Sequence, residues 1–164
     1  MEYKHITHES IPPFINKDSK VLILGSLPST ASRDAGFFYA HPQNRFFKIL
    51  AGVFHEEVPL STEQRKGFLK RNNIALYDVI YECDIVGSSD SSIKNAVPIN
   101  LKDLLNEYSN IKRIFTTGSK AKELFDKYLK ADGIEAIGLP SSSAANAKMS
   151  LDELIEVYKI ILNE

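Results

Sequence analysis

The chain has 164 residues, of which 43% are hydrophobic and 25% charged, and its formal net charge is −1. These values are typical of one soluble globular domain, taken here as residues 1–164, and they exclude a strongly basic protein that coats nucleic acid. No apolar run approaches the roughly 18 residues of a membrane helix, and the first residues lack the apolar core of a signal peptide, so we expect a cytoplasmic protein with no membrane partner.

Cysteine and histidine usage argues against a metal site. Cys83 is the only cysteine, so an internal disulfide and a four-cysteine zinc or iron–sulfur site are excluded. We expect Cys83 to be a small buried hydrophobe rather than a nucleophile. The four histidines show no metal-binding spacing, and His5 and His8, close to a terminus, are expected to be solvated.

Strand and helix patterns alternate along the chain. Short apolar runs predict strands over residues 20–26, 74–80, 111–118 and 134–141. Apolar residues at helical spacing predict helices over residues 44–54, 61–72, 100–109, 119–130 and 150–162, with Ser61 and Ser150 as N-caps. The polar residues 86–95 read as a loop. This alternation predicts an α/β fold with a parallel sheet covered by helices on both faces.

Three loops rich in small residues follow the predicted strands. They are GSLPS (25–29), TTGSK (116–120) and LPSSSAANAK (139–148). Ligands of such sheets bind outside the carboxyl ends of the strands, so we expect these loops to form the site.

The first of these loops opens a segment of about twenty residues, 25–46, with no strand or helix pattern of its own. Long loops of this kind are usually functional or disordered, and the aromatic residues here argue against disorder. Aromatic rings among Gly and Pro could stack on a flat ring, although Phe37 and Phe38 are expected in the core. The amides of Gln43 and Asn44 suit the edge of a nucleobase. Asn44 could equally be the N-cap of the next helix, and both roles stay open.

Common catalytic motifs are absent from the sequence. It contains no phosphate-binding G-x-x-x-x-G-K-[ST], no G-x-G-x-x-G and no G-x-S-x-G nucleophile turn. A serine hydrolase that pairs His41 with a serine of residues 141–143 remains an alternative, but no spacing supports it.

Four segments carry a resemblance to a known family: GSLPS, GFFYAHPQNRFFKIL, YDVIYECDIVGSSDSSI and LPSSSAANA. In this order they resemble the hypoxanthine-DNA (deoxyinosine) glycosylases, a branch of the uracil-DNA glycosylase superfamily close to the mismatch-specific enzymes. The second segment is the most specific.

The resemblance implies a three-layer α/β/α fold with a four-stranded parallel central sheet. It also implies a monofunctional glycosylase that flips a deaminated base out of DNA and hydrolyses its N-glycosidic bond, leaving an abasic site. Hypoxanthine is the first candidate base, with uracil and xanthine as others. The expected partner is DNA, the expected state is a monomer, and no cofactor or metal is expected.

The resemblance also assigns roles to residues. Asn44 matches the catalytic residue of the hypoxanthine branch, and Tyr39 matches the ring that stacks on the flipped base. The remaining substrate-binding positions are Gly25, Ser26, Leu27, Pro28, Ser29, His41 and Thr117. The positions expected to contact DNA are Ser141, Ser142, Ser143, Asn146 and Lys148. Independently of the resemblance, Arg45, Lys94 and Lys120 are further candidate phosphate contacts.

Two of these positions depart from the wider superfamily. Leu27 stands where many members carry Asp or Asn to hold the attacking water, and Thr117 stands where relatives often have Asn. These losses keep open an alternative function, a non-catalytic module that binds nucleic acid or a free nucleobase on the same fold. Asn44 is the strongest evidence against that alternative.

Overall fold

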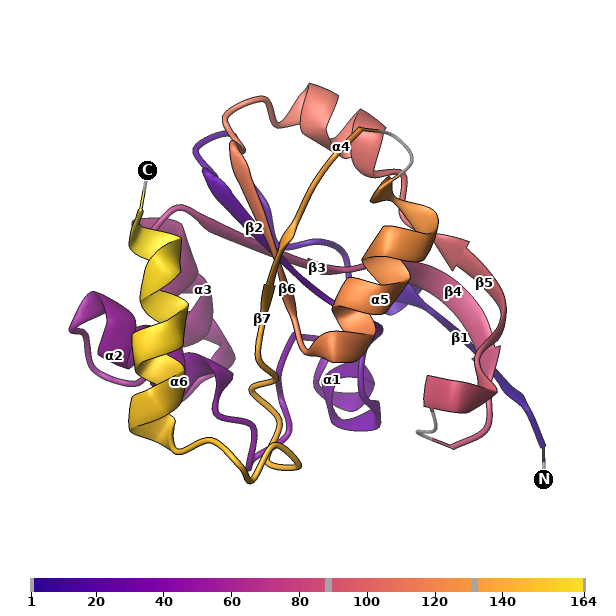
Figure 1. The fold of residues 1–164 in the computed structure, drawn as a ribbon, viewed down its shortest axis with the longest axis horizontal. Coiled ribbons are helices and arrows are strands. Elements are labelled where there is room, and N and C mark those ends of the chain that lie inside the picture. The colour runs from indigo at the N-terminus through magenta and orange to yellow at the C-terminus, as the bar shows by residue number, and fades with distance from the viewer. Residues whose placement is uncertain (1, 88–89, 131–132, 164) are drawn as a thin grey trace.

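A parallel four-stranded sheet forms the centre of the molecule in the computed structural model, which describes residues 2–87, 90–130 and 133–163 (Figure 1). Its strand order is β3-β2-β6-β7. The strands are β2 (Val21–Gly25), β3 (Ile74–Asp78), β6 (Arg113–Thr117) and β7 (Ile137–Leu139). All three strand pairs are parallel, so the four carboxyl ends meet at one edge of the sheet.

Helices cover both faces of this sheet. They are α1 (Thr30–Ala35), α2 (Phe46–Phe54), α3 (Thr62–Arg71), α4 (Leu101–Glu107), α5 (Ser119–Tyr128) and α6 (Leu151–Tyr158), with short 3₁₀ turns η1 (His8–Ser10), η2 (Asp90–Ser92) and η4 (Lys159–Leu162). Figure 1 shows α2, α3 and α6 on one side of the sheet and α5 on the other. The three-layer α/β/α prediction with a four-stranded parallel sheet is confirmed. No helix in the described ranges is long and apolar enough to cross a bilayer.

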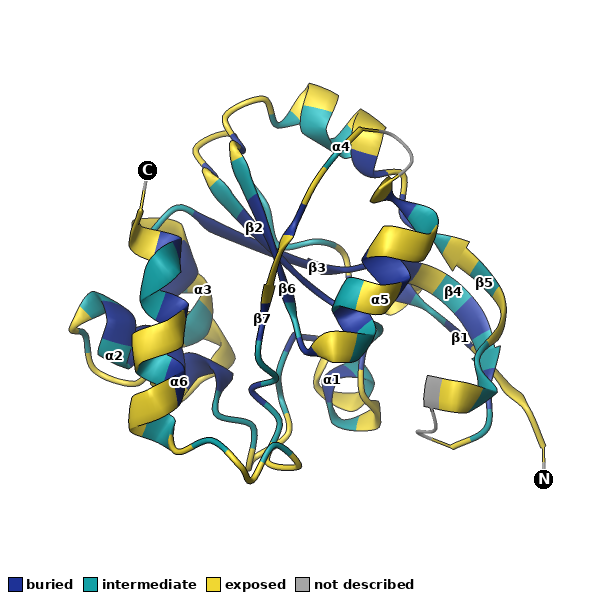
Figure 2. Cartoon of the chain, viewed as in Figure 1, coloured by how far each residue is buried: buried dark blue, intermediate teal, exposed yellow. Residues whose placement is uncertain are grey.

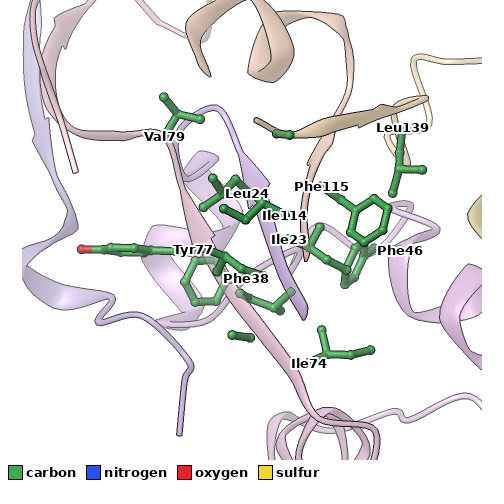
Figure 3. Packing of buried hydrophobic residues seen from close by; sticks show 14 of the residues in the cluster. Ile23, Leu24, Phe38, Phe46, Ile74, Tyr77, Val79, Ile114, Phe115 and Leu139 are labelled. Carbon is green, nitrogen blue, oxygen red and sulfur yellow. The ribbon is translucent and has the colours of Figure 1, made fainter. Parts of the chain in front are cut away.

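The core lies along the central strands. Leu22, Ile23 and Leu24 of β2 are fully buried, and β3 is buried along its whole length (Figure 2). Figure 3 shows these side chains packed with aromatic residues, including Phe46 and Phe115. Burial on both faces explains why the sequence of β2 is a continuous apolar run rather than an alternating one.

A second, antiparallel sheet was not predicted. It consists of β1 (Lys4–Thr7), β4 (Ile80–Ile85) and β5 (Lys94–Pro98), in the order β1-β4-β5. The single predicted strand over residues 74–80 is therefore wrong at its end, because β3 stops at Asp78 and β4 begins at Ile80. The predicted loop over residues 86–95 is also wrong in part, since β5 begins at Lys94; residues 88 and 89 lie outside the described ranges.

The predicted helices are all present, and their predicted caps are confirmed. Ser61 Oγ accepts the Gln64 N–H at 3.1 Å. Ser150 Oγ accepts the Glu153 N–H at 3.1 Å, and the Glu153 carboxylate accepts the Ser150 N–H at 3.0 Å, which completes a capping box.

The segment after β2 was predicted to lack secondary structure, and this was wrong, because it contains α1. Ser29 caps this helix by accepting the Ser32 N–H, and Gly36 ends it at a φ of 72°. The helix has six residues and no apolar periodicity that the sequence could reveal.

Candidate active site

A cavity of about 700 Å³ lies at the carboxyl edge of the parallel sheet. The three loops predicted to meet there do so, and the segment from Gly25 to Ser29 lines its floor. The predicted site residues on its wall are Gly25, Ser26, Leu27, Pro28, Ser29, Tyr39, His41, Asn44, Thr117, Ser141, Ser142 and Ser143. Asn146 and Lys148 do not line it.

The end of β2 is fixed by backbone hydrogen bonds from the chain beyond β3. The carbonyl of Gly25 accepts the Val79 N–H at 2.8 Å, and the carbonyl of Ser26 accepts the Ile80 N–H at 3.0 Å. Leu27 is half-buried on the cavity wall. Its apolar side chain cannot orient a water molecule, as expected from the sequence.

Tyr39 lies as a flat platform beside the cavity. Its backbone adopts a φ of 53°, and its ring stacks on Phe46 with 3.8 Å between ring centroids and 11° between planes. Its hydroxyl is 3.0 Å from Thr117 Oγ1, in a hydrogen bond that either group can donate. Burial, and then the charge of Asp78, hold the pKa of Tyr39 well above its usual range, so the phenol is neutral. The hydroxyl of Thr117 thus anchors the ring.

Asn44 lies one residue before the N-cap of α2, which is Arg45, so the N-cap role that the sequence left open is wrong by one residue. Its Oδ1 accepts the Phe46 N–H, the first amide of α2, at 2.9 Å, and it also accepts the Ser142 hydroxyl at 2.9 Å. A backbone N–H can only donate, so the amide orientation of Asn44 is determined. No hydrogen bond is seen from the Asn44 NH₂ group to any residue in the described ranges, and Asn44 lines the cavity. The NH₂ group is therefore the part of this side chain available to a ligand.

His41 lies at the exposed rim of the cavity. Its Nδ1 accepts the Gln43 N–H at 3.1 Å, so its Nε2 carries the proton when the ring is neutral. None of the hydroxyls of residues 141–143 bonds to His41 in the described part of the chain. Ser142 Oγ donates to Asn44, while the Oγ atoms of Ser141 and Ser143 accept the N–H groups of Ser143 and Ala145. This arrangement gives no support to a serine hydrolase.

Arg45 holds the final loop in place. Its guanidinium donates to the carbonyls of Met149 at 2.8 Å, Asn146 at 2.8 Å and Ser143 at 3.2 Å, and its backbone N–H donates to the Ser142 carbonyl at 3.0 Å. The expectation that Arg45 contacts phosphate is therefore corrected, because both terminal nitrogens of its guanidinium donate within the protein and its Nε is buried.

The other residues expected to contact DNA differ in position. Ser142 is 2% exposed and Asn146 donates its side-chain amide to the Ser141 carbonyl at 3.0 Å, so both shape the loop from within. Lys148 is exposed on the same loop, whereas Lys94 lies on β5, with its ammonium 4.0 Å from the ring centre of Tyr3. Lys120 lines the cavity, and its Nζ lies 3.6 Å from Oε1 of Glu123. Arg33 of α1 also lines it and was missed from the sequence.

Sequence reasoning also missed Asp78 and His8. Asp78 ends β3 and lines the cavity, and its Oδ2 lies 2.8 Å from Nε2 of His8. His8 is 2% exposed, so its expected solvation was wrong. In the sequence, the one signal for Asp78 was that a single Asp ends an apolar strand. The position of Asp78 beside the cavity follows from the register of β2 and β3, which pairs it with Gly25.

Cys83 is fully buried on β4, as expected. Burial raises the pKa of its thiol above the ordinary value, which disfavours the thiolate that a nucleophile requires.

The fold and the site together define an α/β protein with a cavity at the carboxyl edge of its parallel sheet, lined by a stacked tyrosine and by three loops. Residues 12–161 match the family model described as the uracil DNA glycosylase superfamily, and the chain belongs to this superfamily.

Two of the relatives come from species of Methanosarcina. The chain is 34% identical over 142 residues to a hypoxanthine DNA glycosylase of Methanosarcina barkeri, covering 85% of this chain and 89% of that protein. It is 32% identical over 140 residues to a hypoxanthine DNA glycosylase of Methanosarcina acetivorans, covering 85% and 88%. A solution NMR structure of a candidate uracil DNA glycosylase from M. acetivorans matches with a TM-score of 0.77 and 30% identity, over 93% of this chain and 97% of that one. The family and fold that the sequence indicated are confirmed.

Proposed function

We propose that this chain is a monofunctional DNA glycosylase that removes hypoxanthine from DNA. The observation that carries the proposal is the pairing, in one cavity, of the Tyr39 platform with the NH₂ group of Asn44, which makes no hydrogen bond to the described residues. The names of the two Methanosarcina relatives support hypoxanthine as the base. Uracil and xanthine are further candidates, because deamination gives all three bases a ring N–H beside a carbonyl.

The reaction requires the base to leave the duplex first. A base inside the stack is inaccessible, so the enzyme flips it into a pocket. The cavity offers one face of Tyr39 for stacking, with Phe46 supporting the opposite face. A preformed ring platform reduces the cost of holding the flipped base.

Hydrolysis then breaks the bond between the sugar and the base, and negative charge develops on the leaving base. A fixed donor aimed at that charge stabilises the transition state. The NH₂ group of Asn44 is such a donor, because its Oδ1 is already held by Phe46 and Ser142. Leu27 cannot activate water, so we assign most of the catalysis to departure of the base rather than to water activation.

The final loop would contact the strand from which the base has left. Its exposed small residues let the backbone approach DNA, and Lys148 can meet a phosphate there. We propose Lys120 and Arg33 as further phosphate contacts because both line the cavity.

The test uses duplex oligonucleotides that carry a single hypoxanthine, uracil or xanthine, treated with alkali after incubation to cleave abasic sites. We expect strand cleavage with hypoxanthine, and no cleavage before the alkali step. Borohydride added during turnover should trap no covalent adduct, because monofunctional hydrolysis forms no Schiff base.

A trapped adduct would contradict the monofunctional mechanism, and Lys120→Met would then identify the amine. Absence of cleavage on all three substrates, with tight binding to the same DNA, would favour the alternative, a non-catalytic binding module. Leu27 and Thr117 are the features that keep this alternative in view.

A further inference from the structure

His8 and Asp78 form a buried pair against the floor of the cavity. The side chains are 0% and 7% exposed, and Nε2 of His8 lies 2.8 Å from Oδ2 of Asp78. They come from η1 and from the end of β3, about seventy residues apart in the sequence, so the fold brings them together. Burying such a pair is costly compared with an apolar pair of similar volume, which suggests a role beyond stability.

The position of the shared proton follows from the partners of His8. Its Nδ1 lies 2.8 Å from the carbonyl oxygen of Ile11, which can only accept, so Nδ1 carries a hydrogen. Nε2 and Oδ2 approach each other away from ideal hydrogen-bond geometry, yet at 2.8 Å two bare lone pairs would repel. One proton is therefore held between them, and the pair as a whole is neutral.

The second carboxylate oxygen of Asp78 faces the other way. Oδ2 is buried against His8, while Oδ1 occupies the space that a side chain on Gly25 would take: a Cβ there would lie 2.4 Å from Oδ1. Gly25 and Asp78 both line the cavity. The absence of a side chain at Gly25 thus leaves Oδ1 as an acceptor at the cavity floor.

Three aromatic rings lie close to the His8 ring. Tyr77 contacts the His8 ring edge-on at 4.7 Å between centroids, and Phe38 and Tyr81 lie at 6.1 and 6.4 Å. Burial is the main cause that raises the pKa of Tyr39 and of Tyr77; the Asp78 charge adds to it at Tyr39, and Tyr81 and then Asp78 add to it at Tyr77. Both phenols are therefore neutral and add no charge beside Asp78.

We propose that Oδ1 of Asp78 accepts a hydrogen bond from the N1–H of the flipped hypoxanthine, and that His8 is its positioning residue. The inference rests on the proposed function. Hypoxanthine carries a hydrogen on N1, whereas N1 of adenine has only a lone pair, so an acceptor at this place favours hypoxanthine over the adenine from which it forms. The proton shared with His8 also prevents an uncompensated carboxylate from repelling a base that becomes negative as it leaves.

The experiment compares single-turnover excision of hypoxanthine with that of 1-methylhypoxanthine, which lacks the N1–H, in the same oligonucleotide. Wild type should prefer hypoxanthine strongly. In Asp78→Leu, which is close in shape and apolar, we expect the preference to fall at least about tenfold, the size of one lost hydrogen bond to a charged group. Asp78→Asn should keep the preference within about threefold, because its amide can donate to Nε2 of His8 and still present an oxygen to the base.

Variants of His8 separate positioning from packing. His8→Leu should lower the preference as Asp78→Leu does, whereas His8→Gln, whose amide reaches the place of Nε2, should restore it. His5→Leu is the matched control: His5 lies 2.8 Å from Asp84 in an exposed pair on β1 and β4, so its loss should change nothing. The double variant with Leu at both positions guards against misfolding, because it leaves no unpaired buried charge.

An unchanged preference in folded Asp78→Leu, or in the double variant, would overturn the role of Asp78. If His8→Gln and His8→Leu lose the preference for hypoxanthine equally, the positioning role of His8 is overturned. If wild type removes none of the tested bases, the proposed function fails and this inference fails with it. Hypoxanthine excision with no sensitivity to Asp78 would overturn the inference alone.

Discussion

In Asn44, the atom that supports the structure differs from the atom that we propose for the chemistry. Its oxygen accepts the Phe46 N–H at the start of α2 and the Ser142 hydroxyl, while its nitrogen has no hydrogen bond within the described residues. The structural contacts and the proposed donor therefore use different atoms of the same amide. Substitutions that keep one atom and remove the other can therefore separate them.

Asn44→Asp should retain the structural hydrogen bonds and lose the proposed catalytic donor. An Asp carboxylate can still accept the Phe46 N–H and the Ser142 hydroxyl, so the melting temperature should stay close to that of wild type. Replacing the NH₂ donor by an oxygen should lower the single-turnover rate on hypoxanthine by a factor on the order of 10²–10³. Differential scanning calorimetry and quenched-flow excision assays measure the two effects.

Asn44→Ser and Ser142→Ala complete this series. A Ser hydroxyl can still accept the Phe46 N–H, but it is too short to reach the place of the amide nitrogen, so Asn44→Ser should react as slowly as Asn44→Asp. Ser142→Ala leaves the NH₂ donor in place and should cost much less activity. A folded Asn44→Ser variant with wild-type turnover would mean that Asn44 is purely structural, and His41 would be the next candidate.

At the scale of elements, the central sheet and the main helices could be predicted because their signals are local. The run Val21–Gly25 is apolar throughout, and the Ser150–Glu153 pair marks a helix start. The small antiparallel sheet could not be predicted, because β1 pairs with β4 across more than seventy residues and β4 has a mixed burial pattern. Asp78 and His8 were missed for the same reason, since their proximity exists only in the folded register.

Arg45 should behave as a structural clamp of the final loop rather than as a phosphate contact. In Arg45→Met the carbonyls of Ser143, Asn146 and Met149 lose their donor, so the loop should loosen and binding to abasic DNA should weaken. Because no phosphate contact is removed, the slope of log binding constant against log salt should stay the same. Lys148→Ala is the contrasting variant, whose slope should fall by about one. A slope reduced by about one in Arg45→Met would restore the phosphate assignment.

At the scale of the whole molecule, the net charge of −1 limits how DNA can be held. The proposed phosphate contacts are Arg33, Lys120 and Lys148, and each contributes slightly less than one unit to the salt slope. We expect a slope with a magnitude of about three, measured by fluorescence anisotropy across a salt series. A magnitude above about six would reveal an extended basic surface that these residues do not provide.

Stability should fall in alkali because three tyrosines are held as neutral phenols. Burial raises the pKa of Tyr77 to about 12, and it holds the pKa of Tyr39 and of Tyr158 further above the ordinary value of 10.0. Below pH 10 both folded and unfolded states keep these protons. Between pH 10 and 12 only the unfolded state releases them, so the free energy of unfolding decreases as pH rises.

Absorbance at 295 nm, which reports tyrosinate, should show these three ionisations together with the loss of far-ultraviolet circular dichroism. Tyr39→Phe removes one of the three and should shift the transition to higher pH. Full ionisation of all tyrosines in a protein with native circular dichroism would contradict the expectation.

The bonds between the final loop and the start of α2 have a consequence for local opening. The N–H of Arg45 is protected by the Ser142 carbonyl, and that of Phe46 by the Asn44 side chain, which Ser142 also holds. If the final loop moves away, the Arg45 N–H loses its acceptor. The Asn44 side chain, which accepts the Phe46 N–H, then loses its hydrogen bond from Ser142. In native-state hydrogen exchange these two amides should share one opening free energy, well below that of β2. The same opening would uncover the cavity, so the exchange rate of two backbone amides would report how often the site becomes accessible.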